Sequence, residues 1–438
     1  MRTLLPRYSG LALAGLVLST MTLRAEEKPT PQGGSVITAI FQGLLGGSTP
    51  AATAPGSPQQ EAAAKGSHKV DAPIVVLGSD GRTRLQTLCV DPEGRVLALV
   101  APPRGYGAPA KNASGEVQVF GKDGKQVKHW KVDFHTHSIN TGPDGIIYVA
   151  GDGKIARFDS QGKLLSTTEL PFIAEALKDK DALRKEAEEQ LKQQRESMKR
   201  VVEVYRKRVD DLEKIAEDKR TTLQKRQLQQ YKQLLKSYEG PIGEENLDSI
   251  IQSKIGRLRI INGVAVSSKD VFVACGEGKG YGYAVWRLDH DLKNPKRVLT
   301  GLGGCCGQMD IQCCEEDLLV AENTRHQFAR YDRDGKARGS WGKRTTGNDL
   351  SCFGGCCNPM NLRVLKGKEI YTAESEGLIK RFSDKGEFLG VVGHAPLTGG
   401  CKNVAVGVSP DGSKVYFADQ PGSRIIVLTR KPSESTKE

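Results

Sequence analysis

The fold is decided by a phrase that reads GGCCNPMNL at residues 354–362 and that occurs again in altered form. A close version, GGCCGQMDI, stands 51 residues earlier at 303–311, and a reduced version, GGCKNVAV, follows 45 residues later at 399–406. Self-similarity at this period is typical of architectures that stack small units of a few strands each. Because the phrase also carries five of the ten cysteines, it predicts both the repeat and the place of a site.

Outward from the phrase, one apolar strand pattern can be aligned six times. It reads VLALV at 96–100, IYVA at 147–150, VFVA at 271–274, LLVA at 318–321, IYTA at 370–373 and VYFA at 415–418. Further short strands and Gly-containing turns follow each copy, so each unit is predicted to hold four antiparallel strands. Six such units predict an all-β six-bladed propeller. The last unit lacks a fourth strand, which residues 72–77 can supply, closing the ring and removing the open edge.

Parts of these units resemble NHL repeats. PDG at 143–145, YVA at 148–150 and KIARFD at 154–159 carry the resemblance, as do Asp419 and the segment SRI at 423–425. The resemblance covers roughly 72–172 and 257–432. Related six-bladed propellers include binding modules, gluconolactonase-like hydrolases and a metal-dependent lyase, so the resemblance implies the fold and leaves the function open.

The N-terminal segment resembles a secretory signal. Arg2 and Arg7 precede the short apolar run at 11–18, which predicts a signal peptide over 1–25; an uncleaved membrane anchor is the alternative. Residues 26–70 are rich in Ala, Pro, Gly and Ser and are predicted to form a flexible linker. We expect a secreted, periplasmic or cell-envelope protein that has no membrane span once the signal is removed.

A helical insertion divides the propeller into blades 1–2 (71–172) and blades 3–6 (257–432). Over 173–256 the apolar residues are spaced by threes and fours, which predicts a coiled-coil-like arm. We expect one long helix and a shorter helix that folds back after a turn near 218–221. A single solvated helix is the alternative, and self-association through the arm is open. Residues 174–256 hold 19 Lys/Arg and 17 Asp/Glu, so the arm is nearly neutral.

Export favours oxidised cysteines. The disulfide candidates are Cys275, Cys305, Cys306, Cys313, Cys314, Cys352, Cys356, Cys357 and Cys401. Cys313 and Cys314 are expected at the opposite end of an inner strand, too far from the others to pair with them. Two alternatives remain open: a soft-metal site built from Cys and His, with Met309 and Met360 nearby, and a vicinal disulfide that forms a rigid floor under a ligand.

Other candidate ligand-binding residues are expected at the channel mouth, on the same face as the arm: His135, His137, Arg257, Arg259, Glu322, Glu374 and Asp419. The three carboxylates follow second strands, where they could ligate a hard cation or act as acid and base, or simply cap loop amides. The two histidines flank one residue, so a strand places them on one face. Two ordinary surface histidines remain the alternative.

The composition limits the function classes. The net charge of +12 comes without a Lys/Arg run interleaved with aromatics, so a nucleic-acid partner is not predicted. We expect a non-catalytic binding or scaffold module that engages a protein or a small ligand, and we predict no cofactor. The alternative is a metal-dependent, lactonase-like hydrolase or lyase, with a metal held by His135, His137, Cys305 and Cys356.

Overall fold

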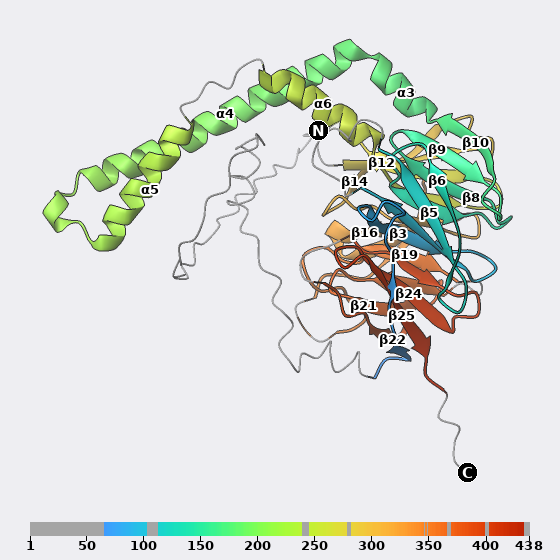
Figure 1. Cartoon of the computed structure of the whole chain (residues 1–438). Coiled ribbons are helices and arrows are strands. Elements are labelled where there is room, and N and C mark those ends of the chain that lie inside the picture. The colour runs from blue at the N-terminus through green and yellow to red at the C-terminus, as the bar shows by residue number, and fades with distance from the viewer. Residues whose placement is uncertain are drawn as a thin grey trace, which may run out of the picture. The chain divides into compact units, whose positions relative to one another are not determined.

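The computed structural model describes residues 65–102, 113–238, 245–277, 282–345, 347, 349–365, 369–398 and 403–432. The predicted signal peptide, most of the predicted linker and Cys401 lie outside the described residues. The described chain is mostly β, and its strands form six antiparallel sheets interrupted by one helical insertion (Figure 1).

The first two sheets precede the insertion. One contains β3 (Arg84–Val90), β4 (Val96–Ala101), β5 (Gly115–Phe120) and β6 (Gln126–Val132); the other contains β7 (Ser138–Thr141), β8 (Ile147–Gly151), β9 (Lys154–Phe158) and β10 (Leu164–Glu169). Within each sheet the order in space is the order in sequence. Strand β4 is buried at every position, because a central strand packs between the sheets on both sides. Its sequence is therefore a continuous apolar run.

Four sheets follow the insertion. The first contains β11 (Ile261–Val266), β12 (Val271–Gly276), β13 (Gly282–Leu288) and β14 (Lys296–Gly303), and the second contains β15 (Ile311–Cys314), β16 (Asp317–Glu322), β17 (Gln327–Tyr331) and β18 (Ala337–Trp341). The third contains β19 (Asn361–Val364), β20 (Ile370–Ala373), β21 (Leu378–Phe382) and β22 (Phe388–His394). The last contains β23 (Val406–Val408), β24 (Lys414–Asp419) and β25 (Arg424–Arg430). A 3-10 turn, η2 (Asn323–Arg325), lies between β16 and β17.

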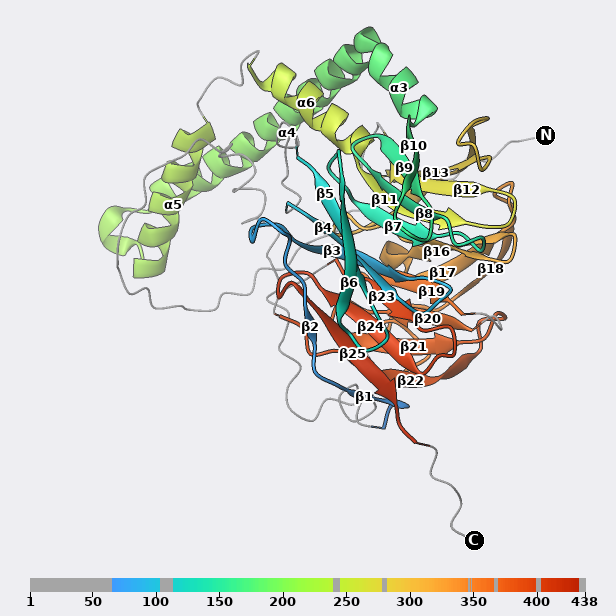
Figure 2. The same ribbon diagram turned by 45° about the vertical axis from the view of Figure 1, so that its right-hand side comes forward.

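The first strands of the six sheets are neighbours in a cycle. Strand β3 contacts β7, and the contacts continue through β11, β15, β19 and β23, which returns to β3. Figure 2 labels β3, β7, β11, β19 and β23. A cyclic arrangement of small antiparallel sheets is the arrangement of a propeller. The fold is therefore propeller-like, with the loops of neighbouring sheets brought close together around the first strands.

The last sheet is completed by residues from the start of the described chain. Strand β1 (His68–Val70) pairs with β25 from Arg430 to Leu428, and β2 (Ile74–Val75) pairs with its beginning. The observed pairing thus starts at His68, four residues before the predicted strand at 72–77. The last three residues of the segment predicted as a linker, 26–70, therefore form strand β1 instead. Buried His68 explains the difference, because its Nε2 lies 3.1 Å from the carbonyl oxygen of Gly412.

The insertion contains more helices than the two predicted: α3 (Pro171–Lys178), α4 (Lys180–Glu213), α5 (Thr222–Tyr238) and α6 (Glu245–Arg259), with a 3-10 turn, η1 (Glu217–Lys219), in the expected turn region. Helix α5 begins at a reciprocal cap, in which Gln224 N–H donates to Thr221 Oγ1 at 3.2 Å and Thr221 N–H donates to Gln224 Oε1 at 2.9 Å. Figure 1 shows α5 folded back along α4.

Two partners share the apolar stripe of α4. Toward its start, Ala187 and Leu191 pack with Ile250 of α6. Toward its end, the Tyr205 ring lies 5.5 Å from the Tyr231 ring of α5. The heptad-like spacing of one long helix is therefore satisfied within the chain, by α6 and by α5 in turn.

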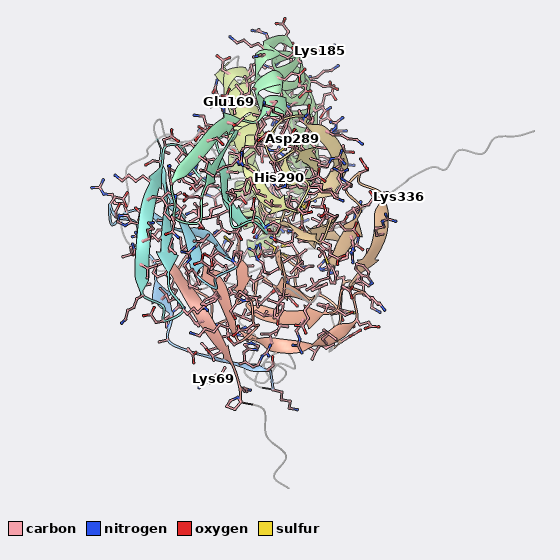
Figure 3. All side chains as sticks on the ribbon, turned by 90° about the vertical axis from the view of Figure 1, so that its right-hand side faces the viewer. Lys69, Glu169, Lys185, Asp289, His290 and Lys336 are labelled. Carbon is pink, nitrogen blue, oxygen red and sulfur yellow. The ribbon has the colours of Figure 1, made fainter. Side chains whose placement is uncertain are left out.

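The insertion is attached at both of its ends. The Phe172 ring of α3 stacks on Trp286 of β13 at 4.3 Å, with an interplanar angle of 2°. At the other end, the carbonyl of Arg259 accepts a 2.8 Å hydrogen bond from Gly153 N–H, between β8 and β9. Figure 3 labels His290 in the β13–β14 turn, whose Nδ1 lies 3.4 Å from the Tyr148 hydroxyl of β8. The two sheets that flank the insertion are thus also joined directly.

Among the residues that the structure describes, no helix is both long enough and apolar enough to cross a membrane.

Candidate functional site

A small polar cavity lies between the first strands of the sheets. Its volume is about 30 Å³, and most of its lining side chains are polar: Gln86, Thr87, His137, Ser138, Asn262, Gln308, Asp310, Gln312, Asn361, Arg363, Asn403 and Gln420. A cavity of this size holds a water molecule or a small ion rather than an organic substrate. Each of the six sheets, or the loop that enters it, contributes to the lining.

Arg363 of β19 ties the cavity wall together. Its Nη1 donates to Asn140 Oδ1 and to Gln312 Oε1, both at 3.0 Å. Its Nε donates to the carbonyl of Val406 at 3.1 Å, and its Nη2 donates to that of Leu88 at 3.3 Å. These partners belong to β7, β15, β23 and β3. One guanidinium therefore links its own sheet to four others, which its planar, multiply donating geometry permits.

Asp310, just before β15, is the buried acid of this network. Its Oδ2 accepts a 2.7 Å hydrogen bond from Leu362 N–H. Burial raises the pKa of Asp310 to about 6, although Arg363 and the bond from Leu362 act in the opposite direction. The group therefore titrates nearer to neutrality than an ordinary aspartate does.

The two predicted histidines form one buried chain of hydrogen bonds. Ile261 N–H donates to His137 Nδ1 at 3.3 Å, so this nitrogen is an acceptor. His137 Nε2–H then donates to His135 Nδ1 at 3.1 Å, and His135 Nε2–H donates to the carbonyl of Pro102 at 3.1 Å. One pair of neutral tautomers satisfies all four ring nitrogens. The pair thus shares an environment as predicted, and each nitrogen already has a protein partner.

The predicted carboxylates lie in separate sheets, and each is held by its own neighbours. Glu322 accepts from Gln327 Nε2 at 2.7 Å, from Arg325 Nη1 at 3.1 Å and from the Tyr331 hydroxyl. All three donors are side chains, so the Glu322 carboxylate is occupied by its own neighbours instead of forming an open ligand site, and these bonds cap no loop amide.

Asp419 is also held within its own surroundings. It accepts from Thr398 Oγ1 at 2.7 Å and from Arg424 Nε at 2.9 Å. Burial would raise the pKa of Asp419, but the hydrogen bonds from Thr398 and Arg424 together lower it. The carboxylate is therefore held in its charged form.

Glu374 makes a fully buried ion pair. Its Oε1 lies 2.5 Å from Lys380 Nζ, which also donates to the carbonyl of Cys352 at 2.6 Å. Burial raises the pKa of Glu374 to about 7, against the attraction of Lys380. The ion pair joins β21 to the turn after β20, and the bond to Cys352 joins Lys380 to the loop that precedes β19.

The predicted arginines lie in the last turn of α6. Arg259 Nη1 is 3.8 Å from Asp152 Oδ1 of the β8–β9 turn. Both arginines precede β11, but they belong to the helical insertion, because α6 runs three residues past the predicted end of the insertion at 256. Their place at a helix C-terminus also suits their charge, because cations stabilise that end of a helix.

The cysteines of the two full phrases come together. Cys306 Sγ lies 3.7 Å from Cys305 Sγ and 3.6 Å from Cys357 Sγ, and the three sulfurs all lie within 4.8 Å of one another. Cys356 Sγ is 3.0 Å from Cys357 Sγ. These distances exceed the S–S bond length of about 2.05 Å. The cluster therefore joins the loops that enter two neighbouring sheets.

The other disulfide candidates lie elsewhere. Cys313 and Cys314 lie within β15 beyond the cavity residues, and Cys275 pairs in register with Ile261. Burial raises the pKa of Cys275 to about 12 and also raises that of Cys313. The Cys352 thiol donates to Asp349 Oδ2 at 3.0 Å. Burial and the bond to Asp349 also raise the pKa of Cys352. The thiols of Cys275, Cys313 and Cys352 are therefore poor nucleophiles, because the thiolate is the reactive form.

Apart from His137, the cavity residues were not predicted from the sequence, although the repeat contained a signal for some of them. Aligning the two full phrases places Asp310 opposite Asn361 and Gln312 opposite Arg363. Alternate residues of a strand share one face, so these polar positions between apolar ones mark the side that faces the cavity.

No protein-family model matches the chain, and no curated protein matches it. Together, the sheets and the polar cavity between their first strands define a propeller-like, all-β protein.

Solved structures similar to the chain have low sequence identity. U3-55K is 8% identical, with 83% of this chain and 98% of that chain covered and a TM-score of 0.42. Raptor from Chaetomium thermophilum is 9% identical, with 86% and 30% covered and a TM-score of 0.38. A protein of unknown function from Bacteroides thetaiotaomicron is 9% identical, with 83% and 73% covered and a TM-score of 0.44. Similarity at this level carries no functional argument.

Proposed function

We propose that the chain is a secreted or periplasmic binding module, a six-bladed, NHL-like propeller that recognises an acidic protein partner through its helical insertion. The observation that carries the proposal is the segregation of charge along this insertion. Residues 192–238 contain fourteen Lys/Arg and seven Asp/Glu, whereas the insertion as a whole is nearly neutral. Helix α5 contributes four basic residues and no acidic one.

The same region presents apolar side chains to solvent. Val204 of α4 is 52% exposed and Leu223 of α5 is 51% exposed. Apolar residues in a region with an excess of one charge can form a protein-binding surface, where the excess charge steers association and the apolar groups supply contact area. We name residues 192–238 the basic hairpin.

The cavity supports binding by the insertion rather than catalysis between the sheets. Arg363, His135, His137 and Glu374 are engaged by neighbouring protein groups, and the cavity holds about 30 Å³. An organic substrate needs a pocket of several hundred Å³. The alternative of a metal-dependent hydrolase or lyase stays a prediction.

Site-specific photocrosslinking in the native host tests the proposal. A photoreactive residue at Leu223 should give discrete adducts with an acidic protein. The matched control is Leu164 of β10, which is 53% exposed and lies outside the basic hairpin; it should give none of these adducts. The triple variant Lys225→Glu, Arg226→Glu, Lys236→Glu should weaken the adducts at Leu223 at least about tenfold. Equal adducts at both positions, or adducts unaffected by charge reversal, would contradict the proposal.

A further inference from the structure

We propose that Cys305, Cys306 and Cys357 form a binding site for one thiophilic d10 cation, Zn(II) or Cu(I). This site goes beyond the proposed binding function and does not depend on it, because it lies at the entry loops of two sheets and not in the basic hairpin. We name the three cysteines the thiol cluster.

The first argument is the distance between the sulfurs. Zinc–thiolate bonds measure about 2.3 Å, so two sulfurs on one tetrahedral zinc lie about 3.8 Å apart. Cys306 Sγ is 3.7 Å from Cys305 Sγ and 3.6 Å from Cys357 Sγ. Both separations fit the edge of a coordination polyhedron and are too long for a disulfide. The three sulfurs, all within 4.8 Å of one another, therefore outline one face of a metal site.

The second argument is that the backbone around the cluster holds this arrangement. Cys306 has a φ of 55°, a left-handed conformation that non-glycine residues seldom adopt. The turn is held by a 3.1 Å bond from Gln308 N–H to the carbonyl of Cys305, and a 2.9 Å bond from Cys305 N–H to Asn323 Oδ1. A third bond, 2.8 Å long, joins Asn262 Nδ2 to the carbonyl of Gly307. Sparsely populated backbone conformations persist where their surroundings fix them and often mark functional positions.

The third argument is the chemistry of the surroundings. Cys357 is buried, and Cys305 and Cys306 pack against the apolar cluster that includes Met360 and Val404. Asn323, which orients Cys305, also donates to Met360 Sδ at 3.5 Å. Thiolate donors with a thioether nearby select soft cations over hard ones. The Cys356 sulfur, 3.0 Å from that of Cys357, lies outside the group of three sulfurs that are all within 4.8 Å of one another.

Metal loading of the full chain tests the site. The protein is reduced with a phosphine under anaerobic conditions, given Zn(II) or Cu(I), and freed of excess metal before elemental analysis. About one ion per chain should remain, and Cd(II) should produce a thiolate charge-transfer absorption. Binding should weaken as the pH falls, because the thiols must lose their protons. Cys306→Ser and Cys357→Ser should each lower the affinity at least about tenfold.

Cys313→Ser is the matched control, because Cys313 belongs to a pair of adjacent cysteines within β15, outside the thiol cluster. This variant should bind metal as the wild type does. If Cys306→Ser does not fold, alkylation of the wild type replaces it: bound metal should protect the thiol cluster and leave the reactivity of Cys313 unchanged. Failure of the reduced protein to retain metal would overturn the proposal. Unchanged stoichiometry and affinity in Cys306→Ser, or a Cys306–Cys357 disulfide in protein purified with Zn(II), would also overturn it. None of these results affects the crosslinking at Leu223.

Discussion

The guanidinium of Arg363 donates to Asn140 Oδ1 at 3.0 Å, across a sequence separation of 223 residues. The same side chain reaches the carbonyls of Leu88 and Val406. A single side chain of β19 therefore fixes the relative positions of strands from both sides of the helical insertion.

Arg363→Ala should lower the free energy of unfolding by about 3–5 kcal/mol, because it leaves buried acceptors on four sheets without their donor and Asp310 without its compensating charge. Chemical denaturation at pH 7 measures the loss. Arg363→Lys should recover less than half of it, since a point charge cannot reproduce the guanidinium fork. The control is Arg338→Ala on edge strand β18, which removes a surface ion pair between Arg338 and Asp332. This variant should change the free energy of unfolding by less than about 0.5 kcal/mol. An equally mild effect at Arg363 would contradict the proposed role.

Asp310→Asn should change how stability depends on pH. The pKa of Asp310 is raised to about 6 in the folded protein, against about 3.9 in the unfolded chain. Between these values the folded state retains a proton that the unfolded state loses, so stability falls as the pH rises from about 4 to 6. The variant should lack this loss and should gain on the order of 1–3 kcal/mol relative to the wild type across the window.

Denaturation at a series of pH values gives this difference. Asp334→Asn is a control of opposite sign, because a hydrogen bond from Lys296 lowers the pKa of Asp334. Its stabilising interaction is lost as the pH falls rather than as it rises. A constant difference between wild type and Asp310→Asn from pH 4 to 7 would rule out this titration.

Lys380→Met should destabilise the protein by about 3–5 kcal/mol at pH 8, because it leaves the Glu374 carboxylate buried without its partner. The loss should shrink toward pH 5. With its pKa raised to about 7 even beside Lys380, Glu374 is protonated there, and the neutral acid is less costly to bury. Adding Glu374→Gln should recover part of the stability at pH 8. A double-mutant cycle measures the coupling, and simple additivity of the two changes would argue against the ion pair.

Phe172→Ala should loosen the start of the helical insertion. The ring stacks on Trp286 at 4.3 Å, and deleting a buried aromatic ring costs about 3–5 kcal/mol. Amide hydrogen exchange in α3 should accelerate, while β15 to β18 keep their protection. Leu164→Ala, at an exposed position of β10, should leave the exchange of α3 unchanged. Uniform acceleration over all sheets would indicate global destabilisation rather than local detachment.

The repeat was predictable from the sequence because its determinants are local. Turns with required glycines and apolar runs of fixed length recur in every unit, as in LLVA before β17 and VYFA before β25. The spacing of apolar residues by threes and fours over 173–256 likewise predicted helix from local sequence. Helix α6 was missed although Leu247, Ile250 and Ile251 have the i, i+3, i+4 spacing of one helix face. That this face packs on α4 is visible only in the tertiary structure.

Some features of the candidate site also follow from local sequence, and others only from the tertiary structure. The sequence by itself determined that the phrases at 303–311 and 354–362 enter equivalent strands, and so which cysteines stand at equivalent positions. Only the tertiary structure decided that Cys306 meets Cys357, that the two histidines satisfy each other, and that Arg363 fills the space between the first strands. The physical reason is range: strand and turn preferences act over a few residues, whereas Cys306 and Cys357 are 51 positions apart and Arg363 reaches Leu88 across 275. The two histidines are close in sequence, but their outer partners, Pro102 and Ile261, are 33 and 124 positions away.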